Sequence, residues 1–142
     1  MTNVSFYKLG GNQEMMFALV CTLIKKAYSQ NKQVLCLIPD DITPSEISSR
    51  LWKFENDSFI PHDIGAESTP IAISNGPLPG SHDEILLNLQ SVIPPWFSQF
   101  DRVIEIIYQD LNNEQAKRKN FRFYKDRGYP LKFHDLSDSF TS

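Results

Sequence analysis

The sequence has few cysteines and no long apolar run, which argues against a disulfide-rich protein, a zinc protein and a membrane-spanning protein. Cys21 and Cys36 stand in apolar surroundings and form no CxxC pair, so the pattern indicates neither a disulfide framework nor a zinc site. We expect two buried free thiols. The longest apolar run, residues 15–24, ends in two lysines and is too short to cross a bilayer. Because the polar start also lacks a secretory signal, we expect a cytoplasmic protein with no membrane partner.

Motifs of common active sites are missing as well. Gly10-Gly11 lies between an expected strand and an expected helix, but neither GxxxxGK[ST] nor GxGxxG is present, so we interpret the pair as a tight turn. His62, His82 and His134 each precede an aspartate, without metal spacing or a nucleophile motif. We predict no catalytic residue, no cofactor and no metal. A small hydrolase using His62 is kept as an alternative.

What the sequence does contain is an alternation of strand and helix patterns over 142 residues, the usual size of one domain. Strands are expected at 3–8, 33–39, 70–74, 84–89 and 102–108, with a final edge strand near 129–136. Helices are expected at 13–30, 43–53 and 112–127. The alternation predicts one α/β domain, residues 1–142, with a mostly parallel (mixed) central sheet flanked by helices.

Local signals mark the helix ends. Asn12 precedes the first helix as an N-cap. Thr43 to Glu46 reads as a capping box with Pro44 at the first helical position. Gly128 stands where a helix commonly ends in a left-handed residue. These signals predict where all three helices begin or end.

The charge is distributed unevenly along the chain. Residues 117–132 hold seven of the 14 Lys and Arg and one acid, a net charge of +6. The total is −3, so the rest of the chain carries −9. Nucleic-acid binders are usually basic over a broad face. A local positive field on an acidic protein instead favours a small acidic target.

The basic segment also carries aromatic rings. At helical spacing, Arg118, Arg122 and Lys125 project from one side, and Phe121 borders that side. We predict a site for an acidic peptide that ends in an aromatic residue, with an arginine pairing its carboxylate. Two alternatives stay open. The cations of a solvated helix can complement the helix dipole, or residues 112–127 can bind single-stranded nucleic acid directly.

A second aromatic group consists of Trp52, Phe54 and Phe59. Trp52 lies off the inward stripe that Ile47 and Leu51 form on the short helix. Trp and Phe are favoured interface anchors. Capping of the sheet edge and contact with a partner protein both remain open for these rings.

Several motifs together resemble the chi subunit of bacterial DNA polymerase III. They are FYKL near the start, VLCLIPDD, LW followed by DSFIPHDI, and the pattern R-x-x-[YF]-[KR]-x-Y-[KR]-x-x-G near the end. The resemblance covers nearly the whole chain and implies a nucleotide-binding-like fold without a phosphate loop. It also implies a non-catalytic accessory subunit of the clamp-loader assembly in DNA replication.

The resemblance implies two partners and contact with DNA only through them. One is the psi subunit, in a one-to-one heterodimer. The other is the acidic C-terminal tail of the single-stranded DNA-binding protein, which ends in a phenylalanine carboxylate. The residues expected to bind the tail are Arg118, Phe121, Arg122, Lys125 and Ile106, and those expected to face psi are Trp52 and Phe59.

The chain departs from the family pattern at two positions of the expected tail site. Glu114 stands where the family has a basic residue ahead of the helix, so the site is not expected to extend toward the helix N-terminus. Phe121 replaces a position that is often tyrosine. A phenol hydrogen bond is therefore not expected there.

Overall fold

A computed structural model describes residues 1–54, 62–64 and 70–137 of the chain, and the backbone alone at 52–54 and 62–64. Along the chain its elements are β1 (Asn3–Lys8), α1 (Gln13–Ser29), β2 (Val34–Leu37), α2 (Pro44–Phe54), β3 (His62–Ile64), β4 (Ile71–Ser74), β5 (Ile85–Asn88), the 3₁₀ helix η1 (Phe97–Gln99), β6 (Arg102–Ile107), α3 (Leu111–Asp126) and β7 (Leu131–Asp135).

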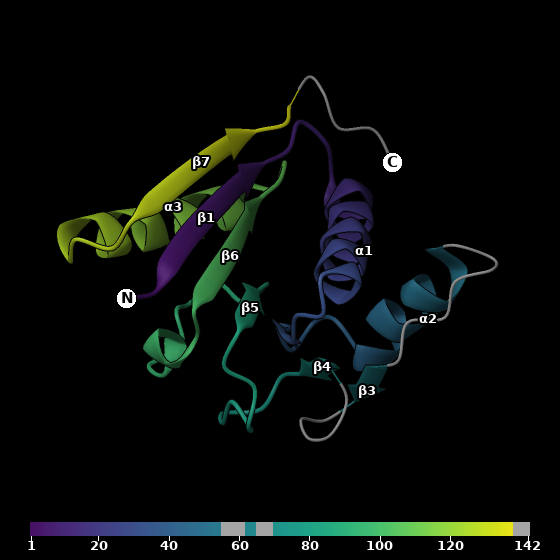
Figure 1. Cartoon of the computed structure of the whole chain (residues 1–142). Helices are drawn as coiled ribbons and strands as arrows, with labels where there is room; N and C mark the ends of the chain where they lie inside the picture. The colour runs from purple at the N-terminus through teal and green to yellow at the C-terminus, as the bar shows by residue number, and fades with distance from the viewer. Residues whose placement is uncertain (55–61, 65–69, 138–142) are drawn as a thin grey trace.

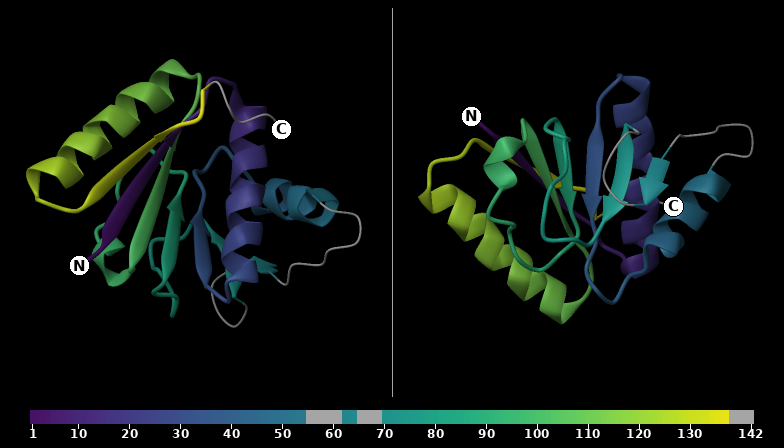
Figure 2. Two further views of the ribbon diagram at one scale, coloured as in Figure 1. Left: turned by 45° about the horizontal axis from the view of Figure 1, so that its top comes forward. Right: turned by 90° about the horizontal axis from the view of Figure 1, so that it is seen from below.

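The strands form one sheet in the order β3-β4-β2-β5-β6-β1-β7 (Figure 1). Every strand pairs in parallel with its neighbours, which confirms the predicted α/β class. Helices α1 and α2 cover one face of the sheet and α3 covers the other (Figure 2). The four side chains of β2 are all buried because both faces are covered there.

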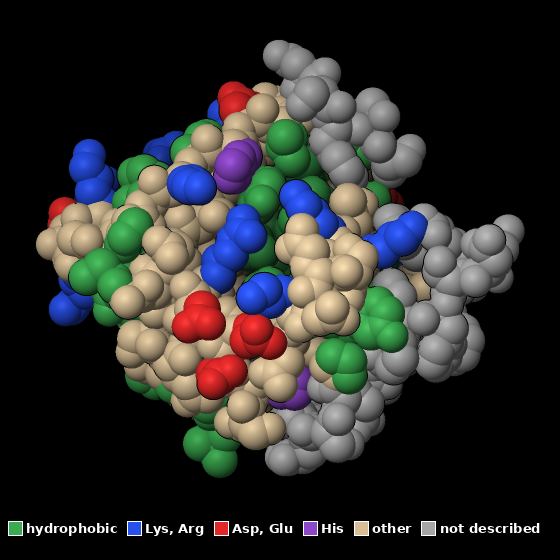
Figure 3. All heavy atoms as spheres, in the orientation of Figure 1, with side chains coloured by type: hydrophobic (Ala, Val, Ile, Leu, Met, Phe, Trp, Pro, Cys, Tyr) green, Lys and Arg blue, Asp and Glu red, His purple; other side chains and the backbone are tan. Residues whose placement is uncertain are grey.

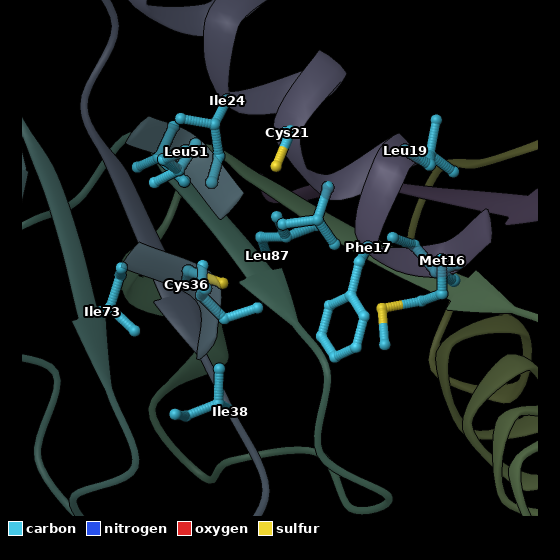
Figure 4. Close-up of a cluster of buried hydrophobic side chains, with 14 of the residues drawn as sticks. Met16, Phe17, Leu19, Cys21, Ile24, Cys36, Ile38, Leu51, Ile73 and Leu87 are labelled. Carbon is cyan, nitrogen blue, oxygen red and sulfur yellow. The ribbon is translucent and has the colours of Figure 1, made fainter. Parts of the chain in front are cut away.

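Two hydrophobic clusters, one on each face, make up the core. The cluster beneath α1 and α2 includes Ile47, Leu51 and both cysteines. In Figure 4, Phe17 and Cys21 of α1 point toward the strands that carry Cys36 and Leu87. The cluster beneath α3 includes Tyr124 and alternating strand residues. Both cysteines are free and buried, as the sequence predicted.

The predicted helix ends are confirmed. The Asn12 side chain accepts a hydrogen bond from Glu14 N at 3.0 Å. Thr43 N donates to the Glu46 carboxylate at 2.8 Å, and Glu46 N donates to Thr43 Oγ1 at 3.3 Å, so the capping box is reciprocal. Gly128 follows α3 with φ 79°, a conformation that favours glycine.

Two features of the sheet differ from the sequence prediction. The short strand β3 is not among the strands that the sequence predicts. The final strand β7 adds to β1 in parallel, so the described sheet has no antiparallel pair.

No helix in the described ranges has the length and apolar character needed to span a membrane. Phe59 lies outside the described residues, and Trp52 is described by its backbone alone.

Candidate functional site

A buried ion pair fastens α3 to the centre of the sheet. Lys117 Nζ lies 2.7 Å from Glu105 Oε1, and the two side chains are 1% and 0% exposed. The same ammonium donates to the carbonyl oxygens of Asn88, at 3.1 Å, and Gln90, at 2.8 Å. All three of its donors therefore have acceptors, which a buried ammonium requires.

The other oxygen of Glu105 is satisfied too. Tyr124 Oη donates to Glu105 Oε2 at 2.9 Å, and Asn88 Nδ2 donates to it at 3.0 Å. Burial, together with the neighbouring Glu105 carboxylate, raises the pKa of Tyr124 far above its ordinary value, so its phenol stays a donor. Asn120 Nδ2 adds a bond to Glu105 Oε1 at 3.3 Å. Three residues of α3 thus converge on one carboxylate of β6.

Because of this network, Lys117 does not contribute its charge to the exposed surface of the basic segment, residues 117–132. The sequence pattern counted Lys117 among the charges gathered for a partner. In the structure its charge is buried against Glu105, so it is not available to an external anion. The cations that α3 exposes include Arg118, Arg122 and Lys125, as the helical spacing predicted.

A groove runs between α3 and the β7 edge of the sheet. It has a volume of about 280 Å³. Its lining residues come from β1, β6, α3 and β7: Lys8, Ile107, Glu114, Lys117, Arg118, Phe121 and Phe133. The groove therefore combines apolar walls with exposed positive charge.

Aromatic contacts hold the walls of the groove in place. The Phe121 ring meets Phe6 edge-on, with centroids 5.2 Å apart, and Phe133 at 6.2 Å. Phe6 is fully buried, whereas Phe133 is 51% exposed. Phe121 is thus anchored on its core side and leaves aromatic surface toward the groove. Arg118 lines the same groove.

Ile106, which was predicted to border the tail site, does not line this groove. Ile106 is 1% exposed and packs in the cluster beneath α1, on the face opposite α3. Its neighbour Ile107 lines the groove with Arg118 and Phe121. Side chains alternate between the two faces of a strand, and the apolar sequence RVIEIIY does not show which face meets α3.

Two other predicted residues lie farther along α3. Arg122 and Lys125 are exposed but do not line the groove. The nearby Arg127 guanidinium lies over the Phe123 ring, 4.4 Å from its centroid. In the space-filling view, Lys and Arg side chains lie along the side of the molecule that α3 and β7 form (Figure 3). The positive field therefore continues beyond the groove.

A larger cleft of about 580 Å³ lies at the carboxyl ends of the strands, where open α/β sheets commonly bind ligands. Asp41 and Asp110 line it, and their charges disfavour a phosphate. The Gly10-Gly11 turn is closed by the chain itself. Gln109 N donates to Gly11 O at 2.8 Å, and a Cβ at Gly10 would lie 2.6 Å from Ser137 O. This confirms the tight-turn interpretation.

Within the described ranges, no group of three or more His, Cys, Asp or Glu side chains is arranged to hold a metal ion. His134 stacks on the Tyr7 ring with centroids 4.6 Å apart, and His82 is buried. The His62 side chain is not described. His134 and His82 therefore pack within the protein.

Comparison with known proteins agrees with the motifs and the fold. Residues 1–132 match the family model described as "DNA polymerase III chi subunit, HolC". The DNA polymerase III subunit chi of Pseudomonas aeruginosa is 37% identical over 139 residues, covering 96% of this chain and 98% of the relative. That of Haemophilus influenzae is 27% identical over 118 residues, covering 80% and 82%. The chain therefore belongs to the DNA polymerase III chi subunit family.

Proposed function

We propose that this protein is a non-catalytic accessory subunit of the replicative DNA polymerase III and its clamp-loader assembly. Together with the psi subunit it links that assembly to the acidic C-terminal tail of the single-stranded DNA-binding protein. The observation that carries the tail-binding half of the proposal is the groove between α3 and β7. There an exposed arginine stands beside an aromatic wall.

The chemistry of the groove fits the end of such a tail. A terminal phenylalanine has a ring and a carboxylate on one residue. Phe121, Phe133 and Ile107 offer apolar surface to the ring. Arg118, from the same wall, can donate two parallel hydrogen bonds to the carboxylate in a bidentate pair. Exposed Arg122 and Lys125 extend the positive field toward the acidic residues that precede the terminus.

Direct binding of DNA by α3 is the competing function. The buried pairing of Lys117 with Glu105 leaves fewer free cations on the helix than the sequence suggested. Outside residues 117–132 the chain has a net charge of −9. Few phosphate contacts and an acidic surface give weak, non-specific affinity for a bare strand.

The psi half of the proposal rests on the family and on the LW…DSFIPHDI block. Trp52 belongs to α2, which covers the sheet face opposite α3. A partner bound at that helix leaves the groove open, so both partners can bind at once. Phe59 is proposed as the second psi-facing ring.

One calorimetric experiment distinguishes the tail from DNA. The protein is titrated with the intact single-stranded DNA-binding protein, with the same protein lacking its C-terminal tail, and with a bare oligonucleotide. We expect binding only to the intact protein. Equal binding to the truncated protein, or tight oligonucleotide binding with a steep salt dependence, would overturn the tail-binding function.

A further inference from the structure

Within the described part of the chain, the outer backbone edge of β7 pairs with no other strand, and this edge lies next to the groove. Val4 N donates to Pro130 O at 2.9 Å, and Leu136 N donates to Lys8 O at 2.8 Å. In this parallel register, the even-numbered residues of β7 exchange hydrogen bonds with β1. The N–H and C=O groups of Leu131, Phe133 and Asp135 therefore point away from β1. β7 is the last strand of the described sheet.

The free edge and the groove are continuous. Phe133 lines the groove with its ring, while its backbone faces outward from the sheet. An extended peptide that lies in the groove against Phe121 and Phe133 passes beside this row of unpaired backbone groups. Exposed strand edges of this kind are templates for strand addition.

We propose that the acidic tail binds as an additional strand parallel to β7, with main-chain hydrogen bonds to Leu131, Phe133 and Asp135. This inference rests on the proposed function, since it takes the tail as the occupant of the groove. Side-chain contacts at Arg118 and Phe121 then select the terminus. Main-chain hydrogen bonds to β7 bind the tail residues that precede the terminus.

The charges along the groove determine the direction of the peptide. α3 runs antiparallel to β7 (Figure 1). Its N-terminal part carries Glu114, which lines the groove together with Lys8 of β1, so the acidic residues of the tail are favoured at the other end of α3, which carries exposed cations. Arg118 comes one turn later, and Arg122 and Lys125 lie toward the end of α3 that precedes β7. The terminal carboxylate therefore sits at Arg118, and the preceding acidic residues run back past Arg122. That direction is parallel to β7.

The first test uses tail peptides that are N-methylated at one amide at a time, with calorimetry on the full chain. In strand pairing only alternate amides face the partner strand. We expect about tenfold weaker binding for methylation at alternate positions and little change at the positions between them. A scan without this alternation would overturn strand addition, even with tight binding of the parent peptide.

The second test follows amide hydrogen exchange by NMR with and without the parent peptide. We expect Leu131 and Phe133 to become protected, whereas Lys132 and His134 are protected already by β1. A Phe133→Ala variant keeps the backbone edge and loses the ring, so it should show weaker binding but the same protected amides. Protection of the odd-numbered amides that depends on protein concentration alone would assign the edge to a second copy of the chain.

The two ways of failing are distinguishable. If the parent peptide does not bind the wild-type chain at all, both the tail-binding function and the strand addition fail. If it binds but leaves the exchange of Leu131 and Phe133 unchanged, the tail-binding function stands. In that case the peptide is held by side chains alone, and the strand proposal is wrong.

Discussion

Lys117 Nζ and Glu105 Oε1 meet at 2.7 Å in the interior, directly beneath the helix that carries Arg118. Lys117 also lines the groove, although its ammonium group pairs with Glu105 of β6. One residue of α3 therefore fixes the helix to the sheet, and the next residue on the chain lines the groove that we propose for the tail. Stability and binding can be separated by mutating these two neighbours.

Replacing Lys117 by Met should destabilise the protein by about 3–5 kcal/mol, because it leaves the Glu105 carboxylate buried without a counter-charge. Urea unfolding measures the loss. Lys119→Met is the matched control, since Lys119 is exposed on the same helix and its loss should cost less than about 0.5 kcal/mol. Equal midpoints for the two variants would show that the buried pair does not hold α3.

Arg118→Ala should weaken tail-peptide binding by about 1–3 kcal/mol, through loss of a charge-assisted contact to the terminal carboxylate. Lys125→Ala should cost about 0.5 kcal/mol, because an exposed ammonium is strongly hydrated. Amidating the peptide terminus should harm binding to the wild type and hardly affect Arg118→Ala. Equal calorimetric losses on amidation in both proteins would show that Arg118 does not contact the carboxylate.

The adjacent isoleucines of β6 should behave differently. Ile107→Ala should weaken tail binding by about 1 kcal/mol, because Ile107 lines the groove. Ile106→Ala should lower the free energy of unfolding by about 2–5 kcal/mol, since it leaves a cavity beneath α1. Peptide affinity of the folded Ile106 variant should stay near wild type. The reverse pattern would return Ile106 to the binding surface.

Trp52→Ala, in α2, and Phe59→Ala should each weaken the heterodimer with psi by about 2 kcal/mol, because aromatic rings are favoured interface anchors. Their affinity for the tail peptide should be unchanged. Phe121→Ala supplies the reciprocal control, with weaker tail binding and normal psi binding. Unchanged psi affinity in both ring variants would remove this surface from the proposal.

Stability should fall at alkaline pH partly through the two thiols. Burial raises the pKa of Cys21 from 9.0 to about 11 and that of Cys36 to about 12. The folded state thus favours the neutral thiols. Their contribution is complete below pH 9.0 and is lost as the pH rises toward these folded values. Unfolding midpoints between pH 8 and 11 should fall less in a Cys21→Ala/Cys36→Ala variant, and an identical slope would contradict this cause.

Periodicity and capping chemistry were enough to predict most of the fold. Helix ends at Asn12, Thr43 and Gly128 depend on local hydrogen bonds that the sequence displays directly. The strand β3 was missed because three residues carry too little pattern, and its pairing with β4 is a tertiary contact. Propensity does not register such pairing.

The candidate site was predictable only in part. The exposed cations of α3 followed from helical spacing, and Phe121 followed from its position beside them. The burial of Lys117 did not, because a lysine in a basic run reads as solvated until its partner Glu105 is known. The position of Ile106 was not predictable for a related reason: the face of β6 that meets α3 depends on how the chain crosses over between them, and not on the sequence of the strand itself.

The neighbours of the first strand have a consequence for how the chain folds. β1 pairs on both sides with strands from the far end of the chain, Asn3 opposite Arg102 and Val4 opposite Leu131. During synthesis β1 therefore emerges long before its two partner strands. Contacts so distant in sequence slow folding, and a chain that stops short of β6 leaves β1 with two open edges. The described sheet is therefore complete only when β7, the last strand to be synthesised, pairs with β1, the first.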